Sequence, residues 1–303
     1  MEMRICTVVI AMILVVFNDN LYAQQDPLYS MSALQPLIVN PSAIGTRSKS
    51  EASVQARNQW SGAANARTIF AQYNGSYYNG QLATGMSFLS DRYGAFNRSM
   101  LSAVQAYQIQ AYGFKISVAL NANIEEYTFG IAQLSHTMSN EVDQALLING
   151  KQNILNFGAS AYAFSDRFWI GFAMPHLMRQ NFRKVADPNF QPAYQTVNTF
   201  INAGGIMKLN DQWDYKSYFS LQFAQNVVPQ LEVGTIAYWK KQWGGGAAYR
   251  FNDAVIMMME YKVNDAFRFG YSYDVTVSPL NAYVRGAHEV MLKYHFGGYQ
   301  GLR

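Results

Sequence analysis

From about residue 49 onward, apolar and polar side chains alternate with a period of two, in segments of seven to thirteen residues. The clearest segment runs from Tyr112 to Asn121, where every second side chain is bulky and apolar. The same rows recur at Phe168, Ile170, Phe172 and Met174, at Tyr215, Phe219, Leu221 and Phe223, and at Phe267, Phe269, Tyr271 and Tyr273. Because successive side chains of a strand point to opposite faces, this pattern predicts strands with one bulky apolar face.

The charged residues of these segments lie on the opposite rows. They are Arg57, Lys115, Lys216, Glu232, Arg250, Glu260, Arg268, Asp274 and Lys293. On the lipid face of a membrane barrel, an Arg or Lys at the midplane costs about 2 to 4 kcal/mol, so a barrel is expected to turn its charges inward. A sandwich of two sheets would also alternate, and periodicity alone leaves both folds open.

Connection lengths separate these two folds. The pattern predicts about fourteen strands, and the even-numbered connections are short turns at 77–79, 108–110, 166–167, 210–214, 241–242 and 263–266. The three long connections, 124–152, 176–198 and 278–287, are all odd-numbered. Short turns at one rim and long loops at the other are typical of outer-membrane barrels. We therefore predict an all-β fold, an antiparallel transmembrane β-barrel with short periplasmic turns and longer extracellular loops.

The amino terminus has the pattern of a signal peptide. Arg4 gives a basic start, residues 5–17 are apolar, and Ala23 supplies the small residue at the cleavage site. We predict a signal peptide at 1–23, a periplasmic N-terminal segment at 24–48, the barrel at 49–296 and a short tail at 297–303. Beyond the signal peptide, no apolar run approaches the roughly 20 residues that a spanning helix needs.

Composition narrows the function classes. Charged residues make up 14% of the chain and hydrophobic residues 50%, which argues against disorder. Without Glu2, Arg4 and Asp19 the chain keeps 22 basic and 17 acidic residues, a balance too mild to indicate nucleic-acid binding. The only cysteine, Cys6, lies in the predicted signal peptide, so disulfides, cysteine-ligated zinc and thiol catalysis are not expected.

Several motifs together resemble the PorP/SprF family, outer-membrane proteins of the type IX secretion and gliding system of Bacteroidota. They include Asn40-Pro41-Ser42-Ala43-Ile44-Gly45, Arg57-Asn58-Gln59-Trp60, Asp91-Arg92-Tyr93-Gly94, Asn156-Phe157-Gly158, Pro175-His176-Leu177, Phe269-Gly270-Tyr271-Ser272-Tyr273-Asp274 and Gly286-Ala287-His288-Glu289. The candidate site residues, expected to be structural or to contact a partner, are Asn40, Pro41, Gly45, Arg57, Asn58, Gln59, Trp60, Asp91, Gly94, Tyr271, Tyr273, Asp274, His288 and Glu289.

The resemblance implies a barrel without enzymatic activity, cofactor or metal. It would support secretion or surface retention of an adhesin-like exported protein, and gliding. The implied partners are outer-membrane lipid, type IX secretion components and an exported protein with a type IX C-terminal signal domain. The long connections 124–152 and 176–198 are the candidates for contact, because recognition usually lies in loops on a rigid scaffold.

Two other functions stay open at this point. A passive pore would need an open lumen, but the lumen rows hold bulky Tyr218, Tyr238, Ile256 and Met258, which indicate a plugged interior. A lipase would need a nucleophile and a base, and Ser135-His136 are the candidates, although on a strand adjacent residues face opposite sides. No histidine has a metal-binding spacing.

The motifs also have structural interpretations. Asn40-Pro41 before Gly45 predicts a turn, because proline fixes φ and glycine admits positive φ. Arg57 and Gln59 are expected to point into the lumen, where Arg57 would join a network with Glu232, Glu260 or Asp274, because interior charges usually pair.

Overall fold

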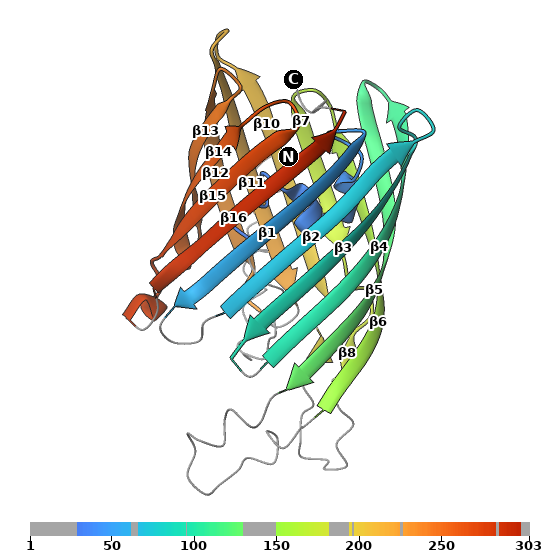
Figure 1. Ribbon diagram of the computed structural model, residues 1–303, viewed down its shortest axis with the longest axis vertical. Coiled ribbons are helices and arrows are strands. Elements are labelled where there is room, and N and C mark those ends of the chain that lie inside the picture. The colour runs from blue at the N-terminus through green and yellow to red at the C-terminus, as the bar shows by residue number, and fades with distance from the viewer. Residues whose placement is uncertain are drawn as a thin grey trace, which may run out of the picture.

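The computed structural model describes residues 29–61, 66–94, 96–129, 150–181, 194–195, 197–224, 227–282 and 285–297. Fourteen of its strands form one closed antiparallel barrel (Figure 1). They are β1 (Ser50–Ser61), β2 (Ala66–Tyr77), β3 (Leu82–Tyr93), β4 (Phe96–Ala111), β5 (Phe114–Phe129), β6 (Gly150–Phe164), β7 (Phe168–Met174), β10 (Asn198–Lys208), β11 (Trp213–Ala224), β12 (Gln230–Trp239), β13 (Trp243–Arg250), β14 (Ala254–Lys262), β15 (Phe267–Thr276) and β16 (Arg285–Phe296). The predicted barrel and its strand number are confirmed.

The first and last strands close the ring. β1 pairs with β16 from Ser50 opposite Phe296 to Ser61 opposite Arg285, and every other strand pairs with its neighbours along the chain. The short strands β8 (Gln180–Asn181) and β9 (Tyr194–Gln195) form a separate sheet in the connection between β7 and β10. Closure matters in a membrane, because lipid offers no partner for the hydrogen-bonding groups of an open sheet edge.

The predicted alternation appears as two faces of one wall. Along β14, the side chains of Ala254, Ile256 and Met258 are buried inside, while Val255 and Met257 point outward and are exposed. The charged rows also lie inside: of the nine charges predicted there, seven are buried and Arg268 is partly exposed. Lys115 is exposed, because it follows the turn before β5 by one residue.

The two rims of the barrel differ as the connection lengths predict. At the rim where β1 begins and β16 ends, the connections are 78–81, 112–113, 165–167, 209–212, 240–242 and 263–266. We call it the short-turn rim. At the other, the long-loop rim, the connections include 130–149, 175–197 and 277–284, the last carrying the 3-10 helix η4 (Pro279–Ala282). Figure 1 shows the long-loop rim at the bottom.

Two predicted boundaries are wrong by several residues. The turn expected at 108–110 lies at Tyr112 and Gly113, both with positive φ, because β4 continues to Ala111. The loop expected at 124–152 is shorter, since β5 extends to Phe129 and β6 begins at Gly150. At the end of β5, Glu125 and Glu126 put polar side chains on both faces, which hides the alternation there. Within the described ranges, no helix has the length and apolar character to cross a membrane.

The N-terminal segment is where the prediction fails most. Residues 24–48 were expected to form a periplasmic segment, but residues 29–48 run inside the ring of strands, where most of their side chains are buried. Figure 1 shows the short helices η1 (Pro36–Ile38) and η2 (Pro41–Ala43) in blue within the barrel. We call residues 29–48 the plug. The prediction was wrong because this segment lacks the strand pattern, and a missing strand pattern does not reveal that a segment is buried.

Candidate functional site

The plug is built from two proline-initiated turns. Pro36 and Pro41 each start a 3-10 helix, where proline's fixed φ is favourable and its missing N–H costs nothing. Asn40 caps the second helix: its Oδ1 accepts hydrogen bonds from the backbone N (3.1 Å) and Oγ (2.7 Å) of Ser42. Its amide donates to the carbonyl of Ala161 on β6 (3.2 Å), so the Asn40-Pro41 motif both forms a turn and ties it to the wall.

Gly45 lies near the end of the plug, where space is tight. Its φ is +65°, and a Cβ there would lie 2.8 Å from Cβ of Ala83 on β3 and 3.0 Å from that of Ser76. The neighbouring backbone is fixed by Gln108, whose amide donates to the carbonyl of Ile44 (2.9 Å). Glycine is required here for two reasons, the positive φ and the close approach of the wall.

Apolar side chains of the plug complete a core with the inner wall. Met31 and Leu34 are almost fully buried and belong to one cluster with residues of β6, β7, β11–β14 and β16. The wall members of this cluster include Tyr162, Trp169, Tyr218, Ile236, Ile256, Met258 and Met291. Three of the four bulky lumen residues noted in the sequence are buried in this core, and Tyr238 packs against it. They help to fill the lumen.

Two buried lysines hold the first turn of the plug from the wall. Nζ of Lys216 on β11 donates to the carbonyl of Ala33 (2.6 Å), and Nζ of Lys293 on β16 donates to that of Leu34. Lys216 also lies over the ring of Trp169, 5.2 Å from its centroid. A short turn leaves backbone carbonyl groups without a partner within the turn, and the two lysines donate hydrogen bonds to such carbonyls.

Beside this core, an ionic network joins the plug to five strands. Arg57 of β1 pairs with Asp274 of β15 and with Glu289 of β16, both at 2.8 Å, and all three side chains are buried. Arg250 of β13 pairs with Glu232 of β12 at 2.8 Å and with Asp274 at 3.3 Å. Asp274 is therefore the centre of the network. The sequence predicted that Arg57 pairs with Glu232, Glu260 or Asp274, and the structure pairs it with Asp274.

Ser30 of the plug lies at the meeting point of these charges. Its Oγ donates to Asp274 (2.6 Å) and accepts from Arg57 (2.7 Å) and Arg250 (3.2 Å). Its backbone N donates to Glu289 (3.0 Å). A buried charge cluster of this kind is costly to break, because each unpaired partner stays desolvated. The network thus makes the start of the plug an integral part of the barrel.

A second buried charge cluster lies at the long-loop rim and holds the start of the connection after β7. Glu125 of β5 accepts from Arg98 of β4 (2.9 Å) and from the hydroxyl of Tyr127 (2.6 Å). Nε2 of His176 lies 2.9 Å from the other carboxylate oxygen of Glu125. All four side chains are buried.

The same connection is fixed by amide side chains. Asn121 and Asn123 both donate to the carbonyl of Pro175, at 3.0 and 2.8 Å. Asn156 of β6 bonds both the N and the O of Met178. We call residues 175–178, with the side chains that hold them, the latch. A side chain at Gly158 would collide with Pro175, which explains glycine in that motif.

The wall separates the predicted site residues into an inward and an outward set. Arg57, Asp274 and Glu289 point inward and form the network, and Gln59 accepts from Nε of Arg57 (3.3 Å). Asn58 and His288 are exposed on the outward face, directly opposite each other on β1 and β16. Tyr271 and Tyr273 share this face: the Tyr271 hydroxyl lies 2.8 Å from Nδ1 of His288, and the Tyr273 ring lies 4.7 Å from the histidine ring.

The remaining predicted residues do not join either set. Asp91 of β3 accepts from the hydroxyl of Thr68 (2.6 Å), and Gly94 takes a φ of +55° in the turn before β4. The side chain of Trp60 lies outside the described residues, as do Ser135 and His136. Among the described residues, no group of three or more His, Cys, Asp or Glu side chains is arranged to hold a metal ion.

The sequence did not single out Ser30, Arg98 or Glu125. The motif Pro175-His176-Leu177 was a signal for the latch, but its partner Glu125 lies on a strand end where the alternation fades. Ser30 has no local signal, because its carboxylate partner is 244 positions away in the chain.

Two exposed ion pairs lie in the turns of the short-turn rim. Nζ of Lys208 lies 2.9 Å from Asp211 and holds the pKa of that carboxyl below its ordinary value through the hydrogen bond and the charge. Lys262 pairs in the same way with Asp265 (2.6 Å). Exposed pairs of this kind contribute little to stability. The network around Asp274 and the cluster around Glu125, by contrast, are buried.

Comparison with known proteins assigns the family. The family model described as type IX secretion system membrane protein PorP/SprF matches residues 21–294 of the chain. The chain belongs to the PorP/SprF family. Its family description names a membrane component of a secretion system and no enzymatic activity. A search among curated proteins finds no match.

Solved structures support the fold of this PorP/SprF protein. The chain resembles the outer membrane protein Omp33 of Acinetobacter baumannii, with a TM-score of 0.50 and 10% identity over 83% of this chain and 100% of that one. It is also similar to the Pseudomonas putida toluene transporter TodX (TM-score 0.47, 9% identity, 90% and 94% covered). A third similar structure is a Pseudomonas aeruginosa FadL homologue, with a TM-score of 0.48 and 11% identity over 85% of this chain and 93% of that one. At such low identity the likeness to Omp33 shows an outer-membrane barrel fold and nothing about activity.

Proposed function

We propose that this PorP/SprF protein is a non-enzymatic outer-membrane component of the type IX secretion system that holds a cognate exported protein at the cell surface. In this account the signal peptide is removed after Ala23, the short-turn rim faces the periplasm and the long-loop rim faces outward. The partners are secretion components and an exported, adhesin-like protein with a type IX signal domain, and gliding would follow from that protein's presence at the surface.

The observation that carries the proposal is the plug. Residues 29–48 fill the centre of the lumen and are bound to the wall by the ionic network, by two lysines and by an apolar core. A barrel closed in this way is suited to binding at its rims and outer face, rather than to transport through its centre. This disfavours the alternative of a passive pore.

The latch supports a role for the long-loop rim. Its buried carboxylate, arginine and histidine fix the start of the connection between β7 and β10 to the wall. Loops that are held on a rigid scaffold are well suited to recognition, because less ordering is required when a partner binds. We therefore propose the connections 130–149 and 175–197 as the surfaces that contact the exported protein.

The test compares cells that lack this gene, complemented with wild type or with variants. Glu125→Gln removes the charge that holds both Arg98 and His176, and replacing residues 131–148 with a Gly-Ser linker removes the other connection. We expect both variants to lose a surface protein to the medium, measured by protease shaving of whole cells and mass spectrometry of cells and supernatant.

A matched control lies at the opposite rim. Lys208→Gln breaks an exposed ion pair at the short-turn rim and is expected to leave the surface protein in place. Heat-modifiable migration on gels verifies that each variant forms the barrel. An unchanged surface protein in both the Glu125 variant and the linker variant would refute the proposal.

A further inference from the structure

A row of polar side chains crosses the outward face of the wall near the long-loop rim. In register from β16 to β4 the row is His288, Asn58, Arg67, Arg92 and Asn97, each directly opposite the next. The first four are exposed, and Asn97 is partly exposed. Elsewhere this face is largely apolar, so a polar row there needs a partner.

The centre of the row is a pair of arginines that face each other on β2 and β3. Like charges directly opposite in an antiparallel pair are destabilising, because their Cβ atoms lie only about 4.5 to 5.5 Å apart. Neither Arg67 nor Arg92 forms an ion pair with a carboxylate of the described residues. Arg92 is oriented by Asn97, whose Oδ1 accepts from its Nε (2.8 Å). Two guanidinium groups on directly opposite residues, without a counter-charge among the described residues, fit an anion with several oxygens, such as a phosphate.

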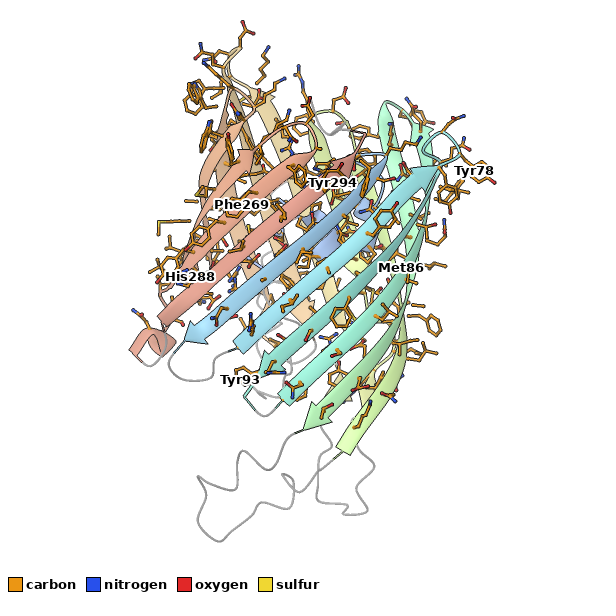
Figure 2. All side chains as sticks on the ribbon, viewed as in Figure 1. Tyr78, Met86, Tyr93, Phe269, His288 and Tyr294 are labelled. Atoms are coloured by element: carbon orange, nitrogen blue, oxygen red, sulfur yellow. The ribbon has the colours of Figure 1, made fainter. Side chains whose placement is uncertain are left out.

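The position of the pair identifies the source of that phosphate as a lipid. Arg67 is the second residue of β2 and Arg92 the last but one of β3, so both lie where the wall reaches the long-loop rim. Figure 2 shows the neighbouring Tyr93 at that end of the wall, and His288 in the same half. Side chains that point outward at this level meet lipid headgroups.

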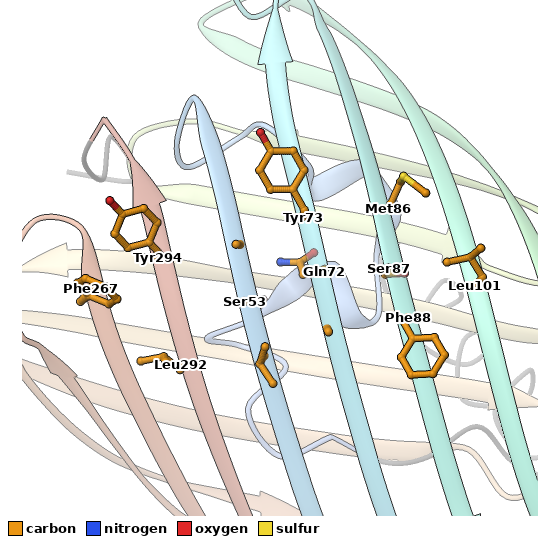
Figure 3. Close-up of a pocket in the computed structure, with 13 residues that line it drawn as sticks. Ser53, Gln72, Tyr73, Met86, Ser87, Phe88, Leu101, Phe267, Leu292 and Tyr294 are labelled. Atoms are coloured by element: carbon orange, nitrogen blue, oxygen red, sulfur yellow. The ribbon is translucent and has the colours of Figure 1, made fainter.

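An apolar groove lies farther along β2 and β3, on the side of the arginines away from the long-loop rim. Its floor includes Ala52 of β1 and Ala71 of β2, where small side chains leave a hollow of about 380 Å³. Figure 3 shows Met86, Phe88 and Leu101 on one side of the groove and Phe267, Leu292 and Tyr294 on the other, with Tyr73 between them.

The groove lies at the right distance for an acyl chain below a bound headgroup. Ala71 follows Arg67 by four residues on β2, about 14 Å along the strand at about 3.4 Å per residue. Because barrel strands are tilted by about 35–45°, this distance corresponds to a depth of about 10 to 11 Å, within the roughly 15 Å of one leaflet of the hydrocarbon core. A lipid whose phosphate binds the arginines would therefore place a chain in the groove.

We propose that this face binds a phosphorylated glycolipid of the outer leaflet, of the lipid A type, with a phosphate on Arg67 and Arg92 and an acyl chain in the groove over Ala71. His288, Asn58 and the Tyr271 hydroxyl add hydrogen-bonding groups beside the arginines. The inference rests on the proposed orientation, in which the long-loop rim faces outward.

The test is native mass spectrometry of the purified protein in detergent, with diphosphoryl lipid A, dephosphorylated lipid A or phosphatidylethanolamine added. Wild type is expected to retain diphosphoryl lipid A about tenfold more strongly than either other lipid, as expected for charge-assisted hydrogen bonds. The double variant Arg67→Gln, Arg92→Gln is expected to lose this preference. Ala71→Trp fills the groove with both arginines intact and is expected to weaken binding independently.

Arg167→Gln, in an exposed turn at the short-turn rim, is the matched control and is expected to bind lipid A as wild type does. Heat-modifiable migration reports the folded barrel in each variant. Equal binding by the double arginine variant, or equal binding of all three lipids, would overturn the proposal. A preference for phosphatidylethanolamine that depends on the arginines would overturn it as well and would reverse the orientation. Because these measurements use purified protein, their failure is separate from a failure of surface retention in cells.

Discussion

The two flanks of the plug are built from different chemistry. On the flank formed by β1 and β12–β16, the ionic flank, the plug meets a buried network of arginines and carboxylates and a close-packed apolar core. On the flank formed by β2–β5, the amide flank, it meets side chains such as Gln72, Ser102, Asn121 and Asn123, with a cavity of about 60 Å³ between them and the plug. Charged groups therefore hold the plug on the ionic flank, whereas neutral hydrogen bonds, such as that from Gln108 to the carbonyl of Ile44, and a small apolar cluster hold it on the amide flank.

This difference indicates where the plug is able to move. Breaking the ionic flank leaves buried charges without partners, whereas the amide flank keeps neutral groups that small rearrangements or water satisfy at low cost. If the plug moves during function, we expect it to separate from β2–β5 first.

The largest effect is expected from breaking the ionic flank. Arg57→Met leaves Glu289 without its cation and weakens the hold on Asp274, which costs about 3 to 5 kcal/mol of the free energy of unfolding. Urea unfolding in lipid vesicles, followed by tryptophan fluorescence, measures this loss. The control Arg167→Met in an exposed turn should change the free energy by less than about 0.5 kcal/mol. Equal losses in the two variants would contradict the comparison.

A pair of leucines in the plug compares the two flanks directly. Leu34 is 2% exposed in the apolar core beside the ionic flank, while Leu37 is only partly buried and lines the cavity. Leu34→Ala is expected to cost about 2 to 5 kcal/mol, and Leu37→Ala at least about 1 kcal/mol less. The same urea titration distinguishes them, and the reverse order would show that the amide flank is the anchoring one.

The smallest effect is expected from filling the cavity. Val104→Ile on β4 adds one methylene group where space remains, so its effect should stay within about 1 kcal/mol in either direction. Val118→Ile on the outward face of β5 serves as the matched control, because it adds the same group toward lipid. A loss of several kcal/mol from Val104→Ile alone would mean that the amide flank is as closely packed as the other.

The barrel itself was accessible from the sequence because its determinants are local. Alternation along one strand separates Ile256 from Met257, and the lengths of the connections distinguish a barrel from a sandwich. Both signals depend on neighbours within a few residues or on short turns. The end of β5 was missed because Glu125 and Glu126 put polar side chains on both faces of the strand.

The plug and the networks were not accessible for the opposite reason. Ser30 meets Asp274 and Glu289 only after the ring has closed, and no local pattern records which carboxylate faces which arginine. The alternation did predict that Arg57 and Asp274 point inward, so the sequence contained the inward row but not its partner in the plug. The arginine pair at 67 and 92 was missed because register between strands is needed to bring the two side chains together.

Conductance in planar bilayers tests the central claim, a lumen closed by its own N-terminal segment, most directly. The wild-type barrel is expected to show no steady large conductance steps. A variant with residues 30–47 replaced by a short Gly-Ser linker should show them, since it keeps all fourteen strands and loses the contacts that fill the centre. Steady large steps from the wild type, with no increase in the linker variant, would contradict the account.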